Sequence, residues 1–365
     1  MKVFKLITKI VLSLLAAVFV FVIASAIHLS MIRTADLNTQ KIRMDKVKTD
    51  YKDYTPKGYL DYSDENLDDY YYNEVSFLAS HNSYKKKGSL IGKLFVGLGD
   101  SFSEAKSLNY SYKPLTDQLK NGIFSFELDI RLRKDNFEIT HVPLVDNSSN
   151  AVNFKLALEE IKLFLDNEPN SFPILVLLEI KDDYMFLDPF LRKIGIEQLK
   201  MLENEIANVL GNYLYSPKDM VGLNNSLMDK INNEGWPKVS ELKRKVMFLI
   251  HAGKYANLYN DEIDLTNQLL FTSSYNNNLN SNMPFVINNS LDVRVINDLV
   301  NQNYMVRTRV GNTLSYSDED VKKALESKAQ ILTSDFLIAR LDLKEHFYFE
   351  NNKTIRLIKS NNKEG

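Results

Sequence analysis

The stretch that decides the fold class reads ILVLLEIK and covers residues 174–181. A continuous apolar run of this length predicts a β-strand covered on both faces, as in the parallel sheets of α/β proteins. The run closes with Glu179 and Lys181, so charged side chains stand at the carboxyl end of the strand. That end is where α/β folds carry their functional groups.

Similar short runs alternate along the chain with segments of helical spacing, which predicts α/β architecture with parallel strands. Their number suits a (β/α)8 TIM-type barrel with distortions. A doubly wound open sheet is the alternative fold, but the chain has no Gly-rich strand-to-helix turn to support it. The Asn-rich segment 276–289 is expected to be a loop. We expect strands at 75–79, 123–132, 137–140, 174–180, 246–250, 271–274, 304–310 and 330–333, and helices at 154–165, 199–210 and 318–328.

The 365-residue chain is 44% hydrophobic and 25% charged, which is ordinary for a globular protein, and its formal net charge is −2. This charge gives no reason to expect a nucleic-acid partner, and no sequence feature indicates a protein partner. The absence of cysteine excludes disulfide bonds, thiolate metal sites and a cysteine nucleophile.

The N-terminus combines a basic start with a long apolar segment. Lys2, Lys5 and Lys9 precede an uncharged run over residues 10–32. The small residues at 24–26 fit a cleaved secretory signal, whereas the 23-residue length of the run also fits a retained membrane anchor. Both interpretations place the rest of the chain outside the cytoplasm, either secreted or anchored to the cell membrane.

The chain therefore divides into four predicted segments. Residues 1–33 form the signal peptide or signal anchor, and residues 34–73 form a polar linker, rich in Tyr and Asp, that ends as a wrap on the domain. Residues 74–340 form the barrel. Residues 341–365 form a C-terminal extension with strand-like runs at 347–349 and 355–358.

Polar side chains gather at five of the expected strand ends. They are His81, Asn82, Glu127, Asp129, Arg131, His141, Glu179, Lys181 and Asp335. Alternation along a strand places Glu127, Asp129 and Arg131 on one face, where buried charges need partners, and a metal ion would meet that need. Because the carboxyl ends of barrel strands share one face, we expect a single site there.

The oxygen atoms of Asn82, Glu127, Asp129 and Glu179 suit a hard cation, calcium or magnesium, rather than zinc. Two histidines beside such an ion suit phosphoryl transfer. One histidine donates to the charge that develops around phosphorus, and the other protonates the leaving oxygen. The residues therefore predict a phosphodiesterase.

In combination, these motifs resemble the calcium-dependent phosphoinositide phospholipase C enzymes, in the bacterial branch of the PLC-like phosphodiesterase superfamily. The resemblance covers residues 75–336 and is carried by HNSY at 81–84, Glu127-x-Asp129, His141, EIK at 179–181 and TSDF at 333–336. Glycerophosphodiester phosphodiesterases share the Glu-x-Asp pair, but their first histidine is usually followed by Arg-Gly. Asn82 and Ser83 stand at that place here.

The resemblance implies a hydrolase that cleaves the glycerol–phosphate bond of phosphatidylinositol-type lipids at a membrane surface, by attack of the inositol 2-hydroxyl. It implies roles for His81 in stabilising the phosphorane, His141 as the acid, Asn82, Glu127, Asp129 and Glu179 as ligands of Ca2+, Glu127 or Glu179 as the base, Lys181 and Arg309 in substrate binding, and Asp335 in orienting a histidine. The alternatives are another phosphodiester substrate, such as a glycerophosphodiester or sphingomyelin, and an inactive binder of lipid head groups.

Arg131 raises an alternative to the metal, because an arginine at the corresponding place replaces the cation in metal-independent bacterial relatives. We favour calcium, since one arginine would not balance three carboxylates. Residues 85–98 raise a separate question, since they join lysines to bulky apolar side chains. This composition suits docking on an anionic bilayer, and it equally suits a short helix whose apolar face packs on the barrel.

Overall fold

The computed structural model describes residues 1–358, and within this range eight parallel strands close into a barrel. The ring closes because β1 pairs with both β2 and β10. This arrangement confirms the (β/α)8 TIM-type barrel. In order around the ring the strands are β1 Val75–Ser80, β2 Ser125–Arg133, β4 Ile174–Ile180, β6 Val246–Ile250, β7 Phe271–Tyr275, β8 Phe285–Ile287, β9 Met305–Val310 and β10 Ile331–Ser334.

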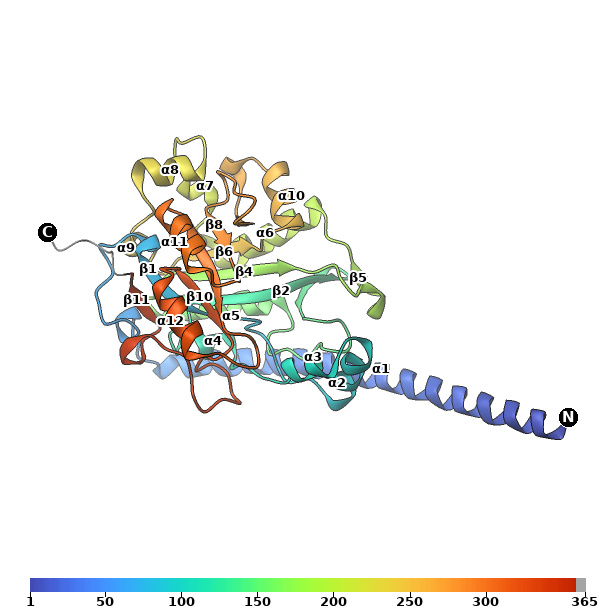
Figure 1. Ribbon diagram of the computed structural model, residues 1–365. Coiled ribbons are helices and arrows are strands. Elements are labelled where there is room, and N and C mark those ends of the chain that lie inside the picture. Colours follow the sequence, from blue (N-terminus) through green and yellow to red (C-terminus); the bar gives the residue numbers. More distant parts are fainter. Residues whose placement is uncertain (359–365) are drawn as a thin grey trace.

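Helices surround the strands, as the alternating sequence pattern predicts (Figure 1). The amphipathic helix α5 is an example, because Phe154, Leu158, Ile161 and Leu165 are all buried on its inner face. The side chain of Asn153 begins this helix by accepting a hydrogen bond from the Leu156 amide at 2.9 Å. Apart from α2 and α3 at residues 90–107, which are described below, the helices after β1 are α4 Leu115–Leu119, α5 Phe154–Asn167, α6 Ile196–Leu210, α7 Pro217–Met220, α8 Leu227–Glu234, α9 Val239–Leu242, α10 Lys254–Glu262, α11 Val293–Asn301 and α12 Asp318–Glu326.

The barrel departs from regular geometry in several places. Strands β3 (Asn136–Ile139) and β5 (Leu191–Arg192) pair antiparallel with the end of β2, and β11 (Ile355–Leu357) pairs antiparallel with β1. The chain between β7 and β8 contains no helix in the described residues. The expected short strand at 347–349 is irregular chain instead.

The prediction of a loop over residues 276–289 is wrong near its end, because β8 lies there. Its three residues Phe285, Val286 and Ile287 are buried and pair with β7 on one side and β9 on the other. A strand this short gives no periodicity of its own within an Asn-rich segment. Its place in the barrel comes from the two neighbours that satisfy its backbone groups.

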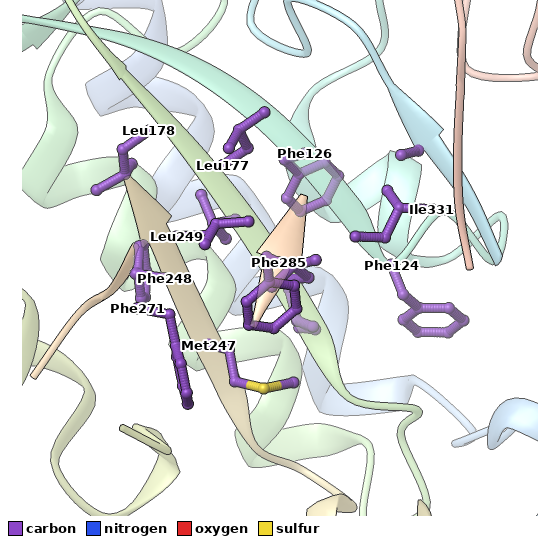
Figure 2. Close-up of a cluster of buried hydrophobic side chains, with 14 of the residues drawn as sticks. Phe124, Phe126, Leu177, Leu178, Met247, Phe248, Leu249, Phe271, Phe285 and Ile331 are labelled. Carbon is purple, nitrogen blue, oxygen red and sulfur yellow. The ribbon is translucent and has the colours of Figure 1, made fainter. Parts of the chain in front are cut away.

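The hydrophobic core fills much of the barrel interior and the space between strands and helices. It includes Phe126, Leu177, Leu249 and Phe285, each with at most 5% of its surface exposed. Figure 2 shows part of this cluster, in which side chains from β2, β4, β6 and β8 come together. Packing of this density holds the strand ends in fixed positions, which is what a site built on several strands requires.

The N-terminal segment is a single long helix, α1 (Lys2–Asp50), whose free half projects away from the barrel (Figure 1). It contains an apolar stretch long enough to span a membrane. Residues 34–50, part of the expected linker, are helical here. Residues 51–73 then wrap the barrel through short 3-10 turns at Tyr51–Asp53, Tyr59–Asp61 and Tyr72–Glu74, whose first tyrosines are buried.

Helices α2 (Leu90–Gly99) and α3 (Phe102–Ser107) lie at the carboxyl ends of the strands, beside the place where α1 leaves the barrel (Figure 1). Ser89 begins α2 by accepting a hydrogen bond from the Gly92 amide at 3.0 Å. A Cβ atom at position 92 would lie 2.2 Å from the carbonyl oxygen of Val145. Glycine is therefore required for α2 to pack against the loop that follows His141.

Candidate active site

The side chains at the bottom of the site meet inside the barrel. Glu127 on β2 accepts a hydrogen bond of 2.6 Å from Arg307 on β9, although β1 and β10 separate these two strands in the sheet. A contact between non-neighbouring strands must cross the interior, so both side chains point inward. Alternation then places Asp129 and Arg309, two residues further along, on the same inward face and closer to the carboxyl ends.

His81 follows β1 and is held by a carboxylate from the residue after β10. Its Nδ1 lies 3.1 Å from Oδ1 of Asp335, and the second oxygen of Asp335 accepts a 2.6 Å hydrogen bond from Arg309. Burial raises the pKa of Asp335, but the charges of His81 and Arg309 outweigh it and hold this pKa well below its usual range. The ionised carboxylate therefore fixes His81 through Nδ1 and leaves Nε2 available.

His141 is held in the same way by the loop that follows it. Its Nδ1 lies 3.1 Å from Oδ2 of Asp146, and the other oxygen of Asp146 accepts a hydrogen bond from the fully buried ammonium group of Lys85. Burial lowers the pKa of His141, but the hydrogen bond to Asp146 and the charges of Asp129 and Asp146 outweigh it. The pKa of His141 is therefore raised, and its protonated form persists to higher pH.

Glu127 lies beneath the histidines and forms a buried ion pair with Arg307. Arg307 also donates to Thr333 at 2.9 Å and to Asn289 at 2.6 Å, so its guanidinium is held by three partners. Burial alone would raise the pKa of Glu127, but the charge of Arg307, with smaller effects from His81, His251 and Arg309, outweighs burial and lowers this pKa to about 2. Glu127 is therefore ionised at neutral pH.

Asp129 has a different environment from Glu127. It is fully buried, and neither of its carboxylate oxygens has a hydrogen-bond partner. The nearest cation, Nζ of Lys181, lies 3.5 Å from Oδ2 and is bonded to Glu179 at 2.7 Å. Burial and the charge of Glu179 raise the pKa of Asp129 to about 6 against the opposing effect of Lys181. A buried carboxylate in this position needs a further positive charge.

A cavity of about 420 Å³ opens above these groups at the mouth of the barrel. The predicted residues that line it are His81, Asn82, His141, Glu179, Lys181 and Arg309, whereas Glu127 and Asp129 lie deeper. Asn82 has a φ of 48°, a left-handed conformation that asparagine adopts more readily than most residues. The fold therefore brings nine of the ten predicted site residues together, Asp335 included.

Arg131 is the exception. Its guanidinium donates to the carbonyl oxygens of Asp183 at 2.7 Å and of His141 at 2.8 Å, and it is also paired with the Asp183 carboxylate. Because β2 extends beyond the barrel, its last residues reach the surrounding loops rather than the interior. These contacts do not support Arg131 as a substitute for the metal, and they assign it to fixing the backbone at His141 instead.

Sequence reasoning missed three groups that organise the site, namely Lys85, Asp146 and Arg307. The signal for Arg307 is its place two residues before Arg309 on an expected strand, which puts both on one face. Lys85 is indistinguishable in sequence from its neighbours Lys86 and Lys87. Asp146 lies in a loop without a pattern, so only the tertiary structure reveals its contact with His141.

Comparison with solved structures places this fold among bacterial phospholipase C barrels. The chain is similar to a calcium-dependent phosphoinositol-specific phospholipase C from Pseudomonas sp., with a TM-score of 0.58, 15% identity, and coverage of 81% of this chain and 98% of the other. It is also similar to a Ca2+-dependent phosphatidylinositol-specific phospholipase C from Streptomyces antibioticus, with a TM-score of 0.53, 16% identity, and coverage of 73% and 94%. The fold class is thus that of the PLC-type TIM barrels.

The sequence itself identifies the family. Residues 131–358 match the family model described as "Phosphoinositide phospholipase C, Ca2+-dependent". The chain therefore belongs to this family, whose members are phosphoric diester hydrolases that act on phosphoinositides and use Ca2+ as cofactor. A search of curated proteins by sequence found no match.

The residues present fit a calcium ion, as judged by Asp129. Asp129 has two buried carboxylate oxygens without hydrogen-bond donors, and Lys181 contacts both Asp129 and Glu179, so carboxylate oxygens of the kind that calcium prefers gather there. Within residues 1–358, no three His, Asp or Glu side chains already form a metal-binding group. Glu127 and Glu179 are paired with Arg307 and Lys181 in this structure.

Proposed function

We propose that the chain cleaves the glycerol–phosphate bond of phosphatidylinositol-type lipids by attack of the inositol 2-hydroxyl on phosphorus. The oxygen–phosphorus bond to the 2-hydroxyl forms, the bond to the glycerol oxygen breaks, and the products are a cyclic inositol phosphate and diacylglycerol. The observation that carries this proposal is the pair of histidines, each held through Nδ1 by a buried carboxylate and both lining one cavity.

In this mechanism the two histidines have different tasks. His141, whose pKa is raised by the hydrogen bond to Asp146 and by the nearby acidic charges against the effect of burial, donates a proton to the departing glycerol oxygen. His81, held next to Arg309, donates hydrogen bonds to the charge that develops on the phosphoryl oxygens. Lys181 and Arg309 line the same cavity and bind the phosphate or inositol group.

Glu179 is better placed than Glu127 to take the proton from the 2-hydroxyl. It lines the cavity, with about a third of its side chain exposed, whereas Glu127 is buried and bonded to Arg307. When held by Asn82, Glu127, Asp129 and Glu179, calcium supplies positive charge that offsets the phosphate and lowers the pKa of the attacking hydroxyl. The proton transfers and the binding of the phosphate are carried out by the side chains named above.

In this proposal the catalytic unit is the barrel at residues 74–340, outside the cytoplasm, and its substrate is presented at a membrane surface. Residues 341–365 form the C-terminal extension, of which residues 359–365 lie outside the described part. Residues 1–33 provide the signal or anchor and residues 34–73 the connection to the barrel.

The test is turnover of phosphatidylinositol, followed by ³¹P NMR, with calcium and with a chelator. We expect a cyclic inositol phosphate, formed only with calcium. Turnover that persists in chelator would contradict the calcium part, and turnover of a glycerophosphodiester or sphingomyelin in preference would contradict the substrate. A His141→Ala protein with wild-type turnover would contradict the catalytic assignment.

A further inference from the structure

The two halves of α1 have different surroundings. Up to Ala24 every residue after Met1 is exposed, and most of these residues from Leu6 onward are apolar. From Ser25 onward the helix has a buried stripe against the barrel, formed by Ser25, Leu29, Asp36, Gln40 and Met44. The helix is continuous across this boundary, which coincides with the small residues at 24–26.

Polar contacts fix the second half of α1 to the barrel. Arg33 donates to Glu138 on β3 at 2.7 Å, and Arg43 donates to Glu160 on α5 at 2.9 Å. Gln40 exchanges two hydrogen bonds with the backbone of Asn153, at 2.8 and 3.0 Å. These contacts set the direction of α1 relative to the barrel, and no flexible connection intervenes.

The exposed half of α1 has the length of a membrane span. About 20 residues are needed to cross the hydrocarbon layer of roughly 30 Å as a helix. Residues 6–25 provide this length, and the lysines at positions 2, 5 and 9 lie at the end away from the barrel. The barrel therefore begins where the span ends, which places it directly against the membrane surface.

The surface next to this boundary is apolar. Leu90, Leu98 and Phe102 on α2 and α3 are between 65% and 81% exposed, and Phe186 in the nearby 3-10 turn Met185–Leu187 is 82% exposed. The ring of Phe95 on α2 stacks against Phe21 of α1, with the ring centroids 6.3 Å apart. The apolar surface of α2 and α3 is thus continuous with the segment that has the properties of a span.

This apolar surface also leads to the catalytic pocket. A groove of about 490 Å³ is lined by Phe95, Val96, Phe186 and Leu187, together with the acidic residues Asp100, Glu104 and Asp183, and it extends to His141. Figure 1 shows β2 and β4 pointing toward the side from which the free half of α1 projects. The mouth of the barrel, the apolar groove and the free half of α1 therefore share one side of the molecule.

We propose that α1 is retained as a membrane anchor and holds the active-site mouth against the same membrane, so that the enzyme acts on lipids of its own bilayer. One consequence for the reaction rests on the proposed function. The diacylglycerol formed beside His141 passes along the groove and stays in the membrane. Retention accounts for the Phe21–Phe95 contact and for the burial of Ser25, because cleavage after Ala26 would remove both.

Retention is tested by peptide mass spectrometry of the full chain, expressed in a bacterial host and recovered from high-salt-washed membranes. We expect peptides that cover residues 10–24 in the protein that carries the barrel. A product that begins within residues 24–28 and is found in the medium would overturn the proposal.

Orientation is tested by fluorescence quenching, which does not require activity. Leu98→Trp is compared with Leu223→Trp. Leu223 lies between α7 and α8, far from α2 and α3 (Figure 1), and both leucines are exposed. In vesicles of phosphatidylcholine and phosphatidylinositol, brominated phosphatidylcholine should quench the indole introduced at position 98 at least severalfold more strongly than the one introduced at position 223, above the background of buried Trp236. Equal quenching at the two positions would overturn the orientation.

Action on its own bilayer is tested with two vesicle populations that carry differently labelled phosphatidylinositol, only one of which contains the full-length protein. We expect at least tenfold faster turnover in the vesicles that contain the protein, and equal rates would overturn the proposal. A water-soluble inositol phosphodiester serves as a separate substrate. If the wild-type protein does not turn over this soluble substrate, the proposed function is contradicted. The quenching result would still decide the orientation.

Discussion

Asp146 joins His141 to Lys85, with one carboxylate oxygen 3.1 Å from Nδ1 of the histidine and the other bonded to the buried ammonium group. Asp146 and Lys85 act on the pKa of His141 in opposite directions. Asp146 raises the pKa of His141, and the charge of Lys85 lowers it. A group that sets the protonation of the proposed acid is thus tied to a lysine that sequence patterns do not distinguish.

The first prediction concerns pH. Activity that needs protonated His141 is present below its pKa and is lost as the pH rises through it. Asp146→Asn removes the group that raises this pKa, so the alkaline limb of the kcat profile should move to lower pH. Lys85→Met removes a charge that lowers the pKa, so the limb should move to higher pH.

Because Asp146→Asn leaves Lys85 buried without its carboxylate, the double variant Lys85→Met/Asp146→Asn is the matched control. It should fold, as judged by its circular dichroism and melting temperature, and should retain the shift to lower pH. Profiles that coincide for the wild type and all three variants would refute the assignment of His141 as the acid.

The second prediction separates the two histidines by leaving group. His141→Ala should reduce turnover of phosphatidylinositol by about 10²–10⁴-fold, the range typical of general acid catalysis. A phenolate leaving group does not need protonation, so His141→Ala should reduce turnover of an inositol aryl phosphodiester much less. His81→Ala should slow both substrates alike. If His141→Ala reduces turnover of the two substrates equally, His141 does not protonate the leaving oxygen.

The third prediction concerns the buried pair of Glu127 and Arg307. Arg307, with smaller effects from His81, His251 and Arg309, outweighs burial and lowers the pKa of Glu127 from 4.5 to about 2. These charges together stabilise the fold above pH 4.5, and the contribution is lost as the pH falls toward 2. The shift corresponds to about 3 kcal/mol of unfolding free energy. Arg307→Met should cost about 3–5 kcal/mol at neutral pH because it leaves a buried charge unpaired.

Urea unfolding between pH 7 and pH 3 measures both effects. Arg307→Met should be least destabilised relative to the wild type at the acidic end, where Glu127 accepts a proton. The double variant Glu127→Gln/Arg307→Met removes both charges and should recover part of the stability. A constant difference between Arg307→Met and the wild type at all pH values would contradict the pairing.

The fourth prediction concerns calcium and Asp129. An ion that binds only the folded state raises the free energy of unfolding, by about 2.7 kcal/mol at a concentration of one hundred times Kd. Asp129→Asn should abolish this calcium-dependent rise in melting temperature. Asp166→Asn, an exposed carboxylate on α5 paired with Lys162, should leave it unchanged. A full calcium effect in Asp129→Asn would exclude this residue as a ligand.

The sequence by itself determined the barrel and most of its site. Apolar runs such as residues 174–178 predict strands because backbone pairing and burial impose a local pattern, and α5, α6 and α12 follow from helical periodicity in the same way. The polar groups at strand ends were visible because each directly follows such a run. The family resemblance then suggested roles for His81 and His141, which local patterns do not provide.

Only the tertiary structure decided which side chains meet. Strand β8 owes its existence to pairing with β7 and β9, and the stripe of α1 that contacts the barrel is partly polar, with Asp36 and Gln40 in it, so it gives no apolar period. Arg131 shares a face with Asp129 by alternation, yet it reaches Asp183 because β2 runs beyond the barrel. Periodicity fixes the face of a strand or helix, whereas contacts between distant segments depend on how the whole chain packs.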